Sequence, residues 1–152
     1  MGITVERVGH VVLKVSDLTR ALEFYRDVLG LSEVASGDFG DGAMVFLSTG
    51  HNHHDIGLVE VGWGARRPEG GDIGLYHVAL RIGDDLDALR EARDQLVAAG
   101  VPIQWIADHT VSQSIYVADP DGNNVELYVD ADPAIWRDDP TAVAHATGLA
   151  LD

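Results

Sequence analysis

Cysteine is absent from the 152 residues of the sequence. This absence excludes a disulfide framework, a metal site with thiolate ligands and a cysteine nucleophile. It also fits a protein that works in a reducing compartment. We therefore expect a cytoplasmic location.

Basic residues are scarce, and long apolar runs are missing. Ten Lys and Arg residues stand against 25 Asp and Glu residues, which gives a formal net charge of -15. A basic surface of the kind that binds nucleic acid is therefore absent, and an anionic membrane surface would repel the chain. No apolar stretch approaches the roughly 18 residues of a membrane span, and the N-terminus has no apolar signal core. We expect neither nucleic acid nor a membrane as a partner.

Hydrophobic residues are plentiful, at 46% of the chain, and they form an internal repeat. Residues 9–15 are matched 67 positions later by residues 76–82, and the match continues without a gap through the following segment. His10 and His77 fall at equivalent positions of the two copies. Two related halves, each with one histidine in a strand, suggest a site built between the halves.

Each half is predicted to fold as strand, helix and three further strands. Val5–Val15 alternates with a period of two, so that Val8, His10 and Val12 share one face. Ser16 or Asp17 can cap the first helix, which carries an apolar stripe of Leu18, Leu22, Tyr25 and Leu29 and ends at Gly30. The other expected elements are strands at 31–35, 43–48, 55–61, 73–82, 102–107, 112–118 and 123–129, and a helix from Asp84 or Asp85 through Ala99.

This pattern predicts an α+β fold in which two βαβββ modules form an open, curved eight-stranded mixed sheet or half-barrel around a metal site. Residues 1–131 are expected to form one domain, with module 1 at about 4–62 and module 2 at about 72–131. The glycine-rich segment 62–71 between them is interpreted as a linker. Residues 132–152 are an acidic tail that either forms a short helix or lies loose.

A third polar residue complements the two histidines. Glu126 alternates with apolar residues in the last strand of module 2, and a carboxylate that points into a cavity is costly unless it is paired or bound to a cation. Two imidazoles and one carboxylate form the ligand set of non-haem Fe(II) oxygenases, and Mn(II) or Zn(II) also fits it. The sequence therefore predicts metal ligands at His10, His77 and Glu126. The plainer reading is that each histidine is a polar strand residue without a ligand role.

Three motifs make the pattern more specific. They are His10-Val-Val-Leu-Lys-Val-Ser-Asp, Ala21-Leu-Glu-Phe-Tyr-Arg-Asp-Val-Leu-Gly-Leu and Ile115-Tyr-Val-Ala-Asp-Pro-Asp-Gly-Asn-Asn-Val-Glu-Leu-Tyr. With them, residues 4–131 resemble the vicinal oxygen chelate superfamily, which includes glyoxalases, extradiol dioxygenases, epimerases, fosfomycin-resistance enzymes and bleomycin-binding proteins. The resemblance implies two βαβββ modules, with metal ligands at His10, His77 and Glu126.

Within that superfamily the chain looks most like a single-domain extradiol (catechol 2,3-type) dioxygenase. Tyr116 lies ten residues before Glu126, His54 precedes an Asp at the start of the last strand of module 1, and His109 lies in the loop before Tyr116. The resemblance implies that His109 or Tyr116 bonds the substrate and moves protons, while His54 assists the oxygen chemistry. The spacing from His109 to Tyr116 is shorter than in two-domain relatives. Without such roles, Tyr116 is a strand aromatic, and His54 and His109 are loop residues.

The predicted function is Fe(II)-dependent extradiol cleavage of a small-molecule aromatic diol by dioxygen, in a homodimer or higher homo-oligomer. One alternative is another metal-dependent enzyme of the superfamily, a glyoxalase-like isomerase or an epimerase. A fourth, carboxylate ligand from module 1 would favour a glyoxalase. The corresponding position falls near His54 to Ile56, which disfavours that activity unless Glu60 serves as a substitute. The other alternative is a metal-free protein that binds a drug or metabolite. The identity of the diol and the roles of His51, His53, His145 and the tail are left open.

Overall fold

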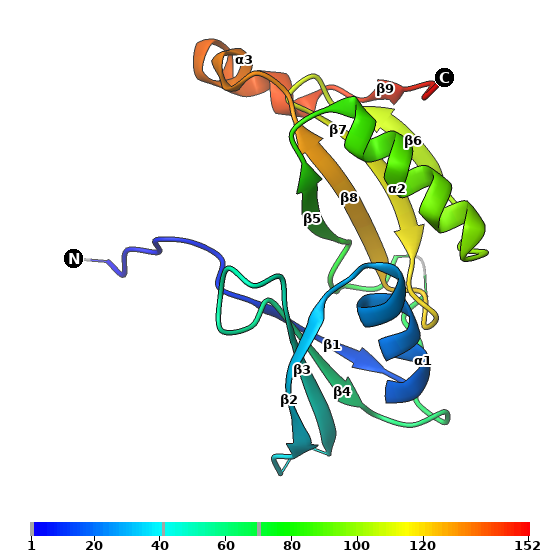
Figure 1. The fold of residues 1–152 in the computed structure, drawn as a ribbon. Helices are drawn as coiled ribbons and strands as arrows, with labels where there is room; N and C mark the ends of the chain where they lie inside the picture. Colours follow the sequence, from blue (N-terminus) through cyan, green and yellow to red (C-terminus); the bar gives the residue numbers. More distant parts are fainter. Residues whose placement is uncertain (1, 41, 70) are drawn as a thin grey trace. The chain divides into compact units, whose positions relative to one another are not determined.

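The computed structural model describes residues 2–40, 42–69 and 71–152. The chain divides into two compact units, residues 1–67 and 68–152 (Figure 1). The division falls inside the segment 62–71 that was interpreted as a linker, of which Gly70 lies outside the described residues. Within these ranges, no helix has both the length and the apolar character that a membrane crossing requires.

Unit 1 is a four-stranded sheet with a short helical segment. Its elements are β1 (Val11–Val15), α1 (Leu18–Leu22), η1 (Glu23–Val28), β2 (Ser32–Asp38), β3 (Ala43–Ser48) and β4 (Ile56–Glu60). The strand order is β1-β4-β3-β2, with β1 parallel to β4 and the remaining neighbours antiparallel. Leu13 and Val15 are buried and Val12 is exposed, as the period of two predicts.

The helical segment of unit 1 differs from the regular helix that was expected. Asp17 caps it by accepting a hydrogen bond from the Arg20 backbone N–H at 3.0 Å. After five residues the α-helix passes into the π-helical segment η1, which changes the face that points at the sheet. The buried residues are Ala21, Phe24 and Tyr25. Of the predicted apolar stripe, Tyr25 is buried and Leu18, Leu22 and Leu29 are half-buried, while Ala21 and Phe24 were not predicted.

Unit 2 repeats the arrangement and extends it by one strand. Its elements are β5 (Val78–Gly83), α2 (Leu86–Ala98), β6 (Trp105–Asp108), β7 (Ser112–Ala118), β8 (Asn124–Asp130), α3 (Pro133–Asp138), η2 (Pro140–Ala144) and β9 (Thr147–Gly148). The strand order is β5-β8-β7-β6-β9, with β5 parallel to β8. Helix α2 crosses one face of this sheet (Figure 1) and buries Leu89 and Leu96. Asp85 caps α2, accepting from the Ala88 N–H at 3.1 Å.

The α+β class and the two βαβββ modules are confirmed, with three local corrections. Strands β1 and β5 begin at Val11 and Val78, so residues 5–10 and 73–77 lie outside the strands. The five residues of β1 pair with the five of β4, so the parallel ladder begins at Val11 and Ile56. Lastly, the tail adds a ninth strand.

The tail is neither loose nor a single short helix. It forms α3, the 3-10 segment η2 and β9, and it buries Ala142 and Leu151. Strand β9 pairs antiparallel with β6, which places Thr147 opposite Asp108 and Gly148 opposite Ala107. The tail is thereby part of unit 2.

Candidate functional site

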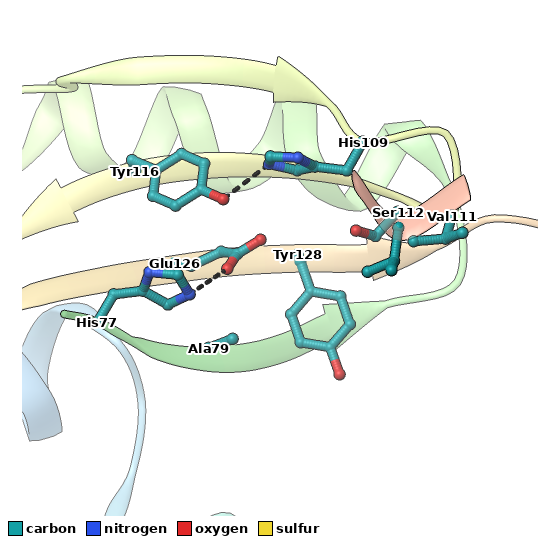
Figure 2. A pocket seen from close by; sticks show the side chains of 9 residues that line it. His77, Ala79, His109, Val111, Ser112, Tyr116, Glu126 and Tyr128 are labelled. Carbon is teal, nitrogen blue, oxygen red and sulfur yellow. Dashed lines mark hydrogen bonds and ion pairs between the residues drawn. The ribbon is translucent and has the colours of Figure 1, made fainter. Parts of the chain in front are cut away.

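Unit 2 contains a pocket of about 350 Å³ on the face of its sheet opposite helix α2 (Figure 2). The pocket is formed by the face of the sheet where polar residues of β7 and β8 alternate with buried apolar ones. The lining residues are His77, Ala79, His109, Val111, Ser112, Tyr116, Glu126, Tyr128 and Val143. Four of the six residues that were predicted to form the site therefore line one pocket.

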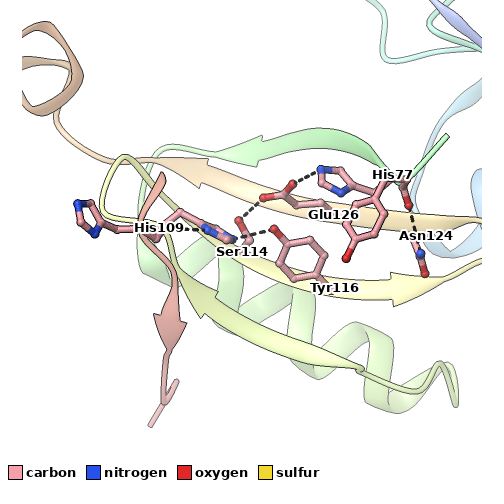
Figure 3. A network of polar contacts seen from close by, with 8 residues as sticks. His77, His109, Ser114, Tyr116, Asn124 and Glu126 are labelled. Carbon is pink, nitrogen blue, oxygen red and sulfur yellow. Dashed lines mark hydrogen bonds and ion pairs between the residues drawn. The ribbon is translucent and has the colours of Figure 1, made fainter. Parts of the chain in front are cut away.

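His77 and Glu126 form the polar centre of this pocket. Nε2 of His77 lies 3.0 Å from Oε2 of Glu126, and Oγ of Ser114 donates a hydrogen bond to Oε1 of Glu126 at 2.6 Å (Figure 3). Glu126 is 8% exposed, and its strand register with β5 places it opposite Ala79. A carboxylate buried to this degree is stable only with such partners or with a cation.

The geometry of this pair fits a metal site. Two ligand atoms that each lie about 2.1 Å from a metal ion, at a right angle, are about 3 Å apart. His77 Nε2 and Glu126 Oε2 have this separation, at 3.0 Å. The other ring nitrogen of His77, Nδ1, is buried and has no hydrogen-bond partner among the described residues. One imidazole and one carboxylate are thus already placed as neighbouring ligands would be.

The third predicted ligand, His10, belongs to unit 1. In the described ranges 2–40, 42–69 and 71–152, no group of three or more His, Asp or Glu side chains is placed to hold a metal ion. The complete set of His10, His77 and Glu126 therefore stays a prediction.

A second polar pair lies beside the first. Nε2 of His109 is 2.7 Å from the hydroxyl of Tyr116 (Figures 2 and 3). The ring of Tyr116 stacks on that of Trp105 with an interplanar angle of 23°. Burial, followed by the negative charge of Glu126, raises the pKa of Tyr116 above its ordinary value. Tyr116 is consequently held as the neutral phenol, a hydrogen-bond donor next to an imidazole.

Unit 1 carries the other two predicted residues in a histidine cluster. The rings of His10 and His54 have centroids 4.2 Å apart, and Nδ1 of His54 lies 2.6 Å from Nδ1 of His53. Burial, followed by the charges of His10 and His53, lowers the pKa of His54 below its ordinary value. His54 is therefore neutral at pH 7 and can accept a proton.

Asp55, which follows His54, has a structural role. Its carboxylate accepts hydrogen bonds from the Thr49 backbone N–H at 2.7 Å, from the Asn52 side chain at 2.7 Å and from the Thr49 hydroxyl at 2.9 Å. Burial alone would raise the pKa of Asp55, but these hydrogen bonds lower it below its ordinary value. Asp55 thus fixes the β3–β4 loop that carries His54.

Unit 1 has no acidic residue at the position that corresponds to Glu126. In unit 2, Ala79 of β5 pairs with Glu126, and the equivalent pair in unit 1 is Val12 with Gly57. The fourth-ligand position was expected near His54 to Ile56, and the strand register instead assigns it to Gly57. Glu60 does not replace it there, because it lies three residues further along β4 and so points to the opposite face from Gly57. Its carboxylate accepts a hydrogen bond from the Leu18 backbone N–H at 2.9 Å.

Several site residues were missed from the sequence, and Ser114 and Val143 are the two with contacts that matter most for the site. Ser114 lies on β7 between Ser112 and Tyr116, and the period-two pattern that selects Tyr116 also places Ser114 on the same face. That signal was present in the sequence. Val143 comes from the tail, and no local pattern in the sequence indicates that this segment returns to the pocket.

Comparison with known proteins identifies one family, and the similar proteins within it include dioxygenases and lactoylglutathione lyases. The family model described as Glyoxalase/Bleomycin resistance protein/Dioxygenase superfamily matches residues 7–127. Biphenyl-2,3-diol 1,2-dioxygenase 3 of Rhodococcus globerulus is 36% identical over 82% of this chain and 63% of its own length. Catechol-2,3-dioxygenase of Bacillus subtilis (strain 168) is 31% identical over 95% of this chain and 49% of its own length. The chain therefore spans about half of the length of one of these relatives and less than two-thirds of the other.

A probable lactoylglutathione lyase of Synechocystis is 27% identical over 78% of this chain and 91% of its own length. Among solved structures, a glyoxylase/bleomycin resistance protein/dioxygenase domain from Frankia sp. EAN1pec superposes with a TM-score of 0.72 at 19% identity, over 84% of this chain and all (100%) of that one. At this identity the structural match supports the fold alone.

Proposed function

We propose that this chain, which belongs to the Glyoxalase/Bleomycin resistance protein/Dioxygenase superfamily, is a metal-dependent extradiol dioxygenase that opens the ring of a catechol-like diol. The observation that carries the proposal is the pocket of unit 2. There the His77–Glu126 pair lies beside the His109–Tyr116 pair. The dioxygenase relatives, at 36% and 31% identity, support the same reaction class.

His10, His77 and Glu126 would hold the metal, with His10 supplied by the same chain or by a second copy. Fe(II) is the metal proposed, with Mn(II) or Zn(II) as substitutes. When bound, it would act as a Lewis acid toward both diol oxygens and bring dioxygen next to the ring. Ser114 would hold the Glu126 carboxylate in one orientation, because its hydroxyl bonds to the oxygen that does not face His77.

The second pair would move protons. The hydroxyl of Tyr116, held neutral, can accept a hydrogen bond from a substrate hydroxyl while it donates its own proton to Nε2 of His109. A proton lost by the substrate can thereby pass through Tyr116 to His109. His54, whose pKa is lowered, would accept or return a proton on the dioxygen side. Ala79, Val111 and Val143 give the pocket apolar walls that suit an aromatic ring.

The test is reconstitution of the purified protein with Fe(II) in the absence of air, followed by addition of oxygen and a panel of catechols. Oxygen uptake together with a yellow ring-opened product is the expected result. His77→Gln should abolish both, whereas His51→Gln, a change of the same kind on an exposed loop, should preserve both. No oxygen uptake across a broad panel by the metal-loaded protein would refute the proposal.

A second candidate is lactoylglutathione lyase activity. One observation favours it: the chain covers 91% of the length of the Synechocystis relative. Gly57 opposes this activity. It occupies the position of the fourth, carboxylate ligand and has no side chain that could bind a metal ion. Measuring lactoylglutathione formation in the protein loaded with each of the three metals separates the two activities.

The remaining expectations concern metal content, assembly and location. A metal-free binding protein is the third candidate, and metal analysis of the freshly purified protein distinguishes it from both enzymes. We propose a homodimer or higher homo-oligomer, which light scattering after size-exclusion chromatography tests. A cytoplasmic location agrees with the lack of cysteine.

A further inference from the structure

The C-terminal segment returns to the pocket of unit 2. Strand β9 pairs with the edge strand β6, and the backbone N–H of Leu149 donates to the carbonyl of Ile106 at 3.0 Å. Just before β9, Val143 lines the pocket. The segment therefore reaches the pocket through a fixed strand register.

One backbone atom of this segment contacts the proposed proton-transfer pair. Nδ1 of His109 lies 3.3 Å from the carbonyl oxygen of His145. A carbonyl oxygen accepts hydrogen bonds and cannot donate them, so Nδ1 must carry the proton. The neutral ring of His109 then has its lone pair on Nε2, which faces the Tyr116 hydroxyl at 2.7 Å.

The loop that carries His109 is constrained from its other side as well. Thr110 has a φ of 70°, which is unusual for a β-branched residue. Its backbone N–H donates to Oδ1 of Asp108 at 2.7 Å, and the His109 N–H donates to the Ser112 carbonyl at 2.8 Å. A strained backbone that is held by several bonds is a common feature of functional sites.

The far end of the segment is anchored to helix α2. The guanidinium of Arg93 donates to the Leu151 carbonyl, and Nε of Arg90 donates to the Asp152 carbonyl at 3.0 Å. Leu151 is buried at 7% exposure. These contacts hold β9, and with it the His145 carbonyl, next to the His109 loop.

We infer that the C-terminal segment 140–149 is a positioning element for His109. Through the His145 carbonyl it holds the imidazole as the Nδ1–H tautomer, so that Nε2 is the proton acceptor in the pocket. The tautomer follows from the contacts alone, whereas its value for turnover rests on the proposed dioxygenase function. Free neutral imidazole favours the Nε2–H form, so the Nδ1–H form reports the two contacts of the ring together: the His145 carbonyl at Nδ1 and the Tyr116 hydroxyl at Nε2. The change caused by a tail variant measures the share of the His145 carbonyl.

The test measures the ring-nitrogen chemical shifts of His109 in ¹⁵N-labelled, metal-free protein, at a pH where its imidazole is neutral. The signals are assigned by their loss in His109→Gln. The wild type should show a protonated Nδ1 and an unprotonated Nε2. Leu149→Pro removes the N–H that bonds to Ile106, and should shift the ring toward Nε2–H. Leu149→Ala keeps that N–H and should keep the wild-type tautomer.

A second full-length variant serves if Leu149→Pro does not fold. Arg90→Gln combined with Arg93→Gln releases the carbonyls of residues 151 and 152, and should move the tautomer in the same direction. An Nε2–H tautomer in the wild type would overturn the inference. So would an unchanged tautomer in a folded variant whose amide exchange shows that β9 has detached.

Turnover gives an independent readout. In Fe(II)-loaded protein, Leu149→Pro should lower kcat on the order of 10-fold while KM for the diol changes little, because a misplaced proton acceptor affects the transition state. Equal losses in Leu149→Ala would contradict the positioning role. If no variant and no wild-type protein turns over a diol, the proposed function fails while the tautomer experiment still decides the inference.

Discussion

The two units are copies of one pattern, and they differ at the pair of residues that decides which copy holds an acid. In unit 2, Ala79 on β5 stands beside Glu126 on β8, whereas in unit 1 Val12 on β1 stands beside Gly57 on β4. The large side chain of Glu126 thus has the small residue Ala79 as its neighbour, whereas Gly57 has the larger residue Val12. Unit 2 thereby gains a polar pocket, and unit 1 keeps a histidine cluster around a rigid loop.

The units also differ at their C-terminal ends. After β8 the chain continues into α3, η2 and β9, which close the β6 edge of unit 2. Unit 1 leaves its edge strand β2 exposed along its whole length. The added segment gives unit 2 the Val143 wall and the contact to His109. The asymmetry of the proposed site is therefore built by one pair of differing residues within the repeat and one extension beyond it.

Removing the acid of unit 2 should have the largest effect. Glu126→Gln keeps the size of the side chain and its bond to Ser114, but it removes the charge that a metal needs. We expect metal content and ring cleavage to fall by at least about 100-fold, since loss of residues that merely support a ligand already costs about 10- to 100-fold. Metal analysis and oxygen uptake check this. Asp130→Asn on the same strand, an exposed acid paired with Arg81, is the control and should retain its metal.

Removing the phenol next to His109 should have the second-largest effect. Tyr116→Phe keeps the stacking on Trp105 but deletes the hydroxyl that lies 2.7 Å from His109. We expect kcat to fall by about 100-fold with little change in KM or in metal content, which is the lower range for loss of an acid–base group. A fall in metal content equal to that of Glu126→Gln would show that Tyr116 instead supports the metal ligands.

The sequence predicted those parts of the fold that depend on local periodicity. The predicted limits of β3 and β7 match those observed, and Asp17 and Asp85 cap their helices as expected. The errors arise where the limits of an element or the burial of a side chain depend on residues that are distant in the sequence. The start of β1 depends on the length of β4, and the burial of Phe24 depends on a π-helical turn that the helical period does not anticipate.

The residues of the candidate site also fall into those that local sequence patterns predicted and those that depend on the tertiary structure. The repeat and the Tyr116–Glu126 spacing predicted four residues that line the pocket, because strand alternation fixes which face each side chain occupies. The Gly57 position needed the strand register, which sequence patterns define only to within a few residues. Val143 and the His145 carbonyl were beyond prediction, since they reach the pocket through pairing between β6 and β9.

Loosening the histidine loop of unit 1 should have a moderate effect on stability. Asp55→Asn removes the charge that accepts hydrogen bonds from Thr49 and Asn52, and we expect a loss of about 1 to 2 kcal/mol at pH 7. The pKa of Asp55 is lowered from 3.8 in the folded state, so its contribution is present above pH 3.8 and is lost as the pH falls below that value. Urea unfolding of both proteins at pH 7 and pH 3 should show a difference that shrinks in acid. If the difference in unfolding free energy between the two proteins were the same at both pH values, the charge of Asp55 would not contribute to stability.

Filling the glycine of unit 1 should have the smallest effect and tests the Val12–Gly57 pairing directly. A Cβ at residue 57 would lie 3.1 Å from Cγ2 of Val12, so Gly57→Ala should cost about 1 kcal/mol in urea unfolding. Val12→Ala, which creates the Ala79 arrangement of unit 2, should reverse the sign, because alanine at 57 then gains about 0.5 kcal/mol from the lower entropy of the unfolded chain. Gly64→Ala, where nothing lies within 4 Å of the added atom, is the control. Equal costs of Gly57→Ala in both backgrounds would mean that Val12 does not close this position, and that unit 1 has room for the acid it lacks.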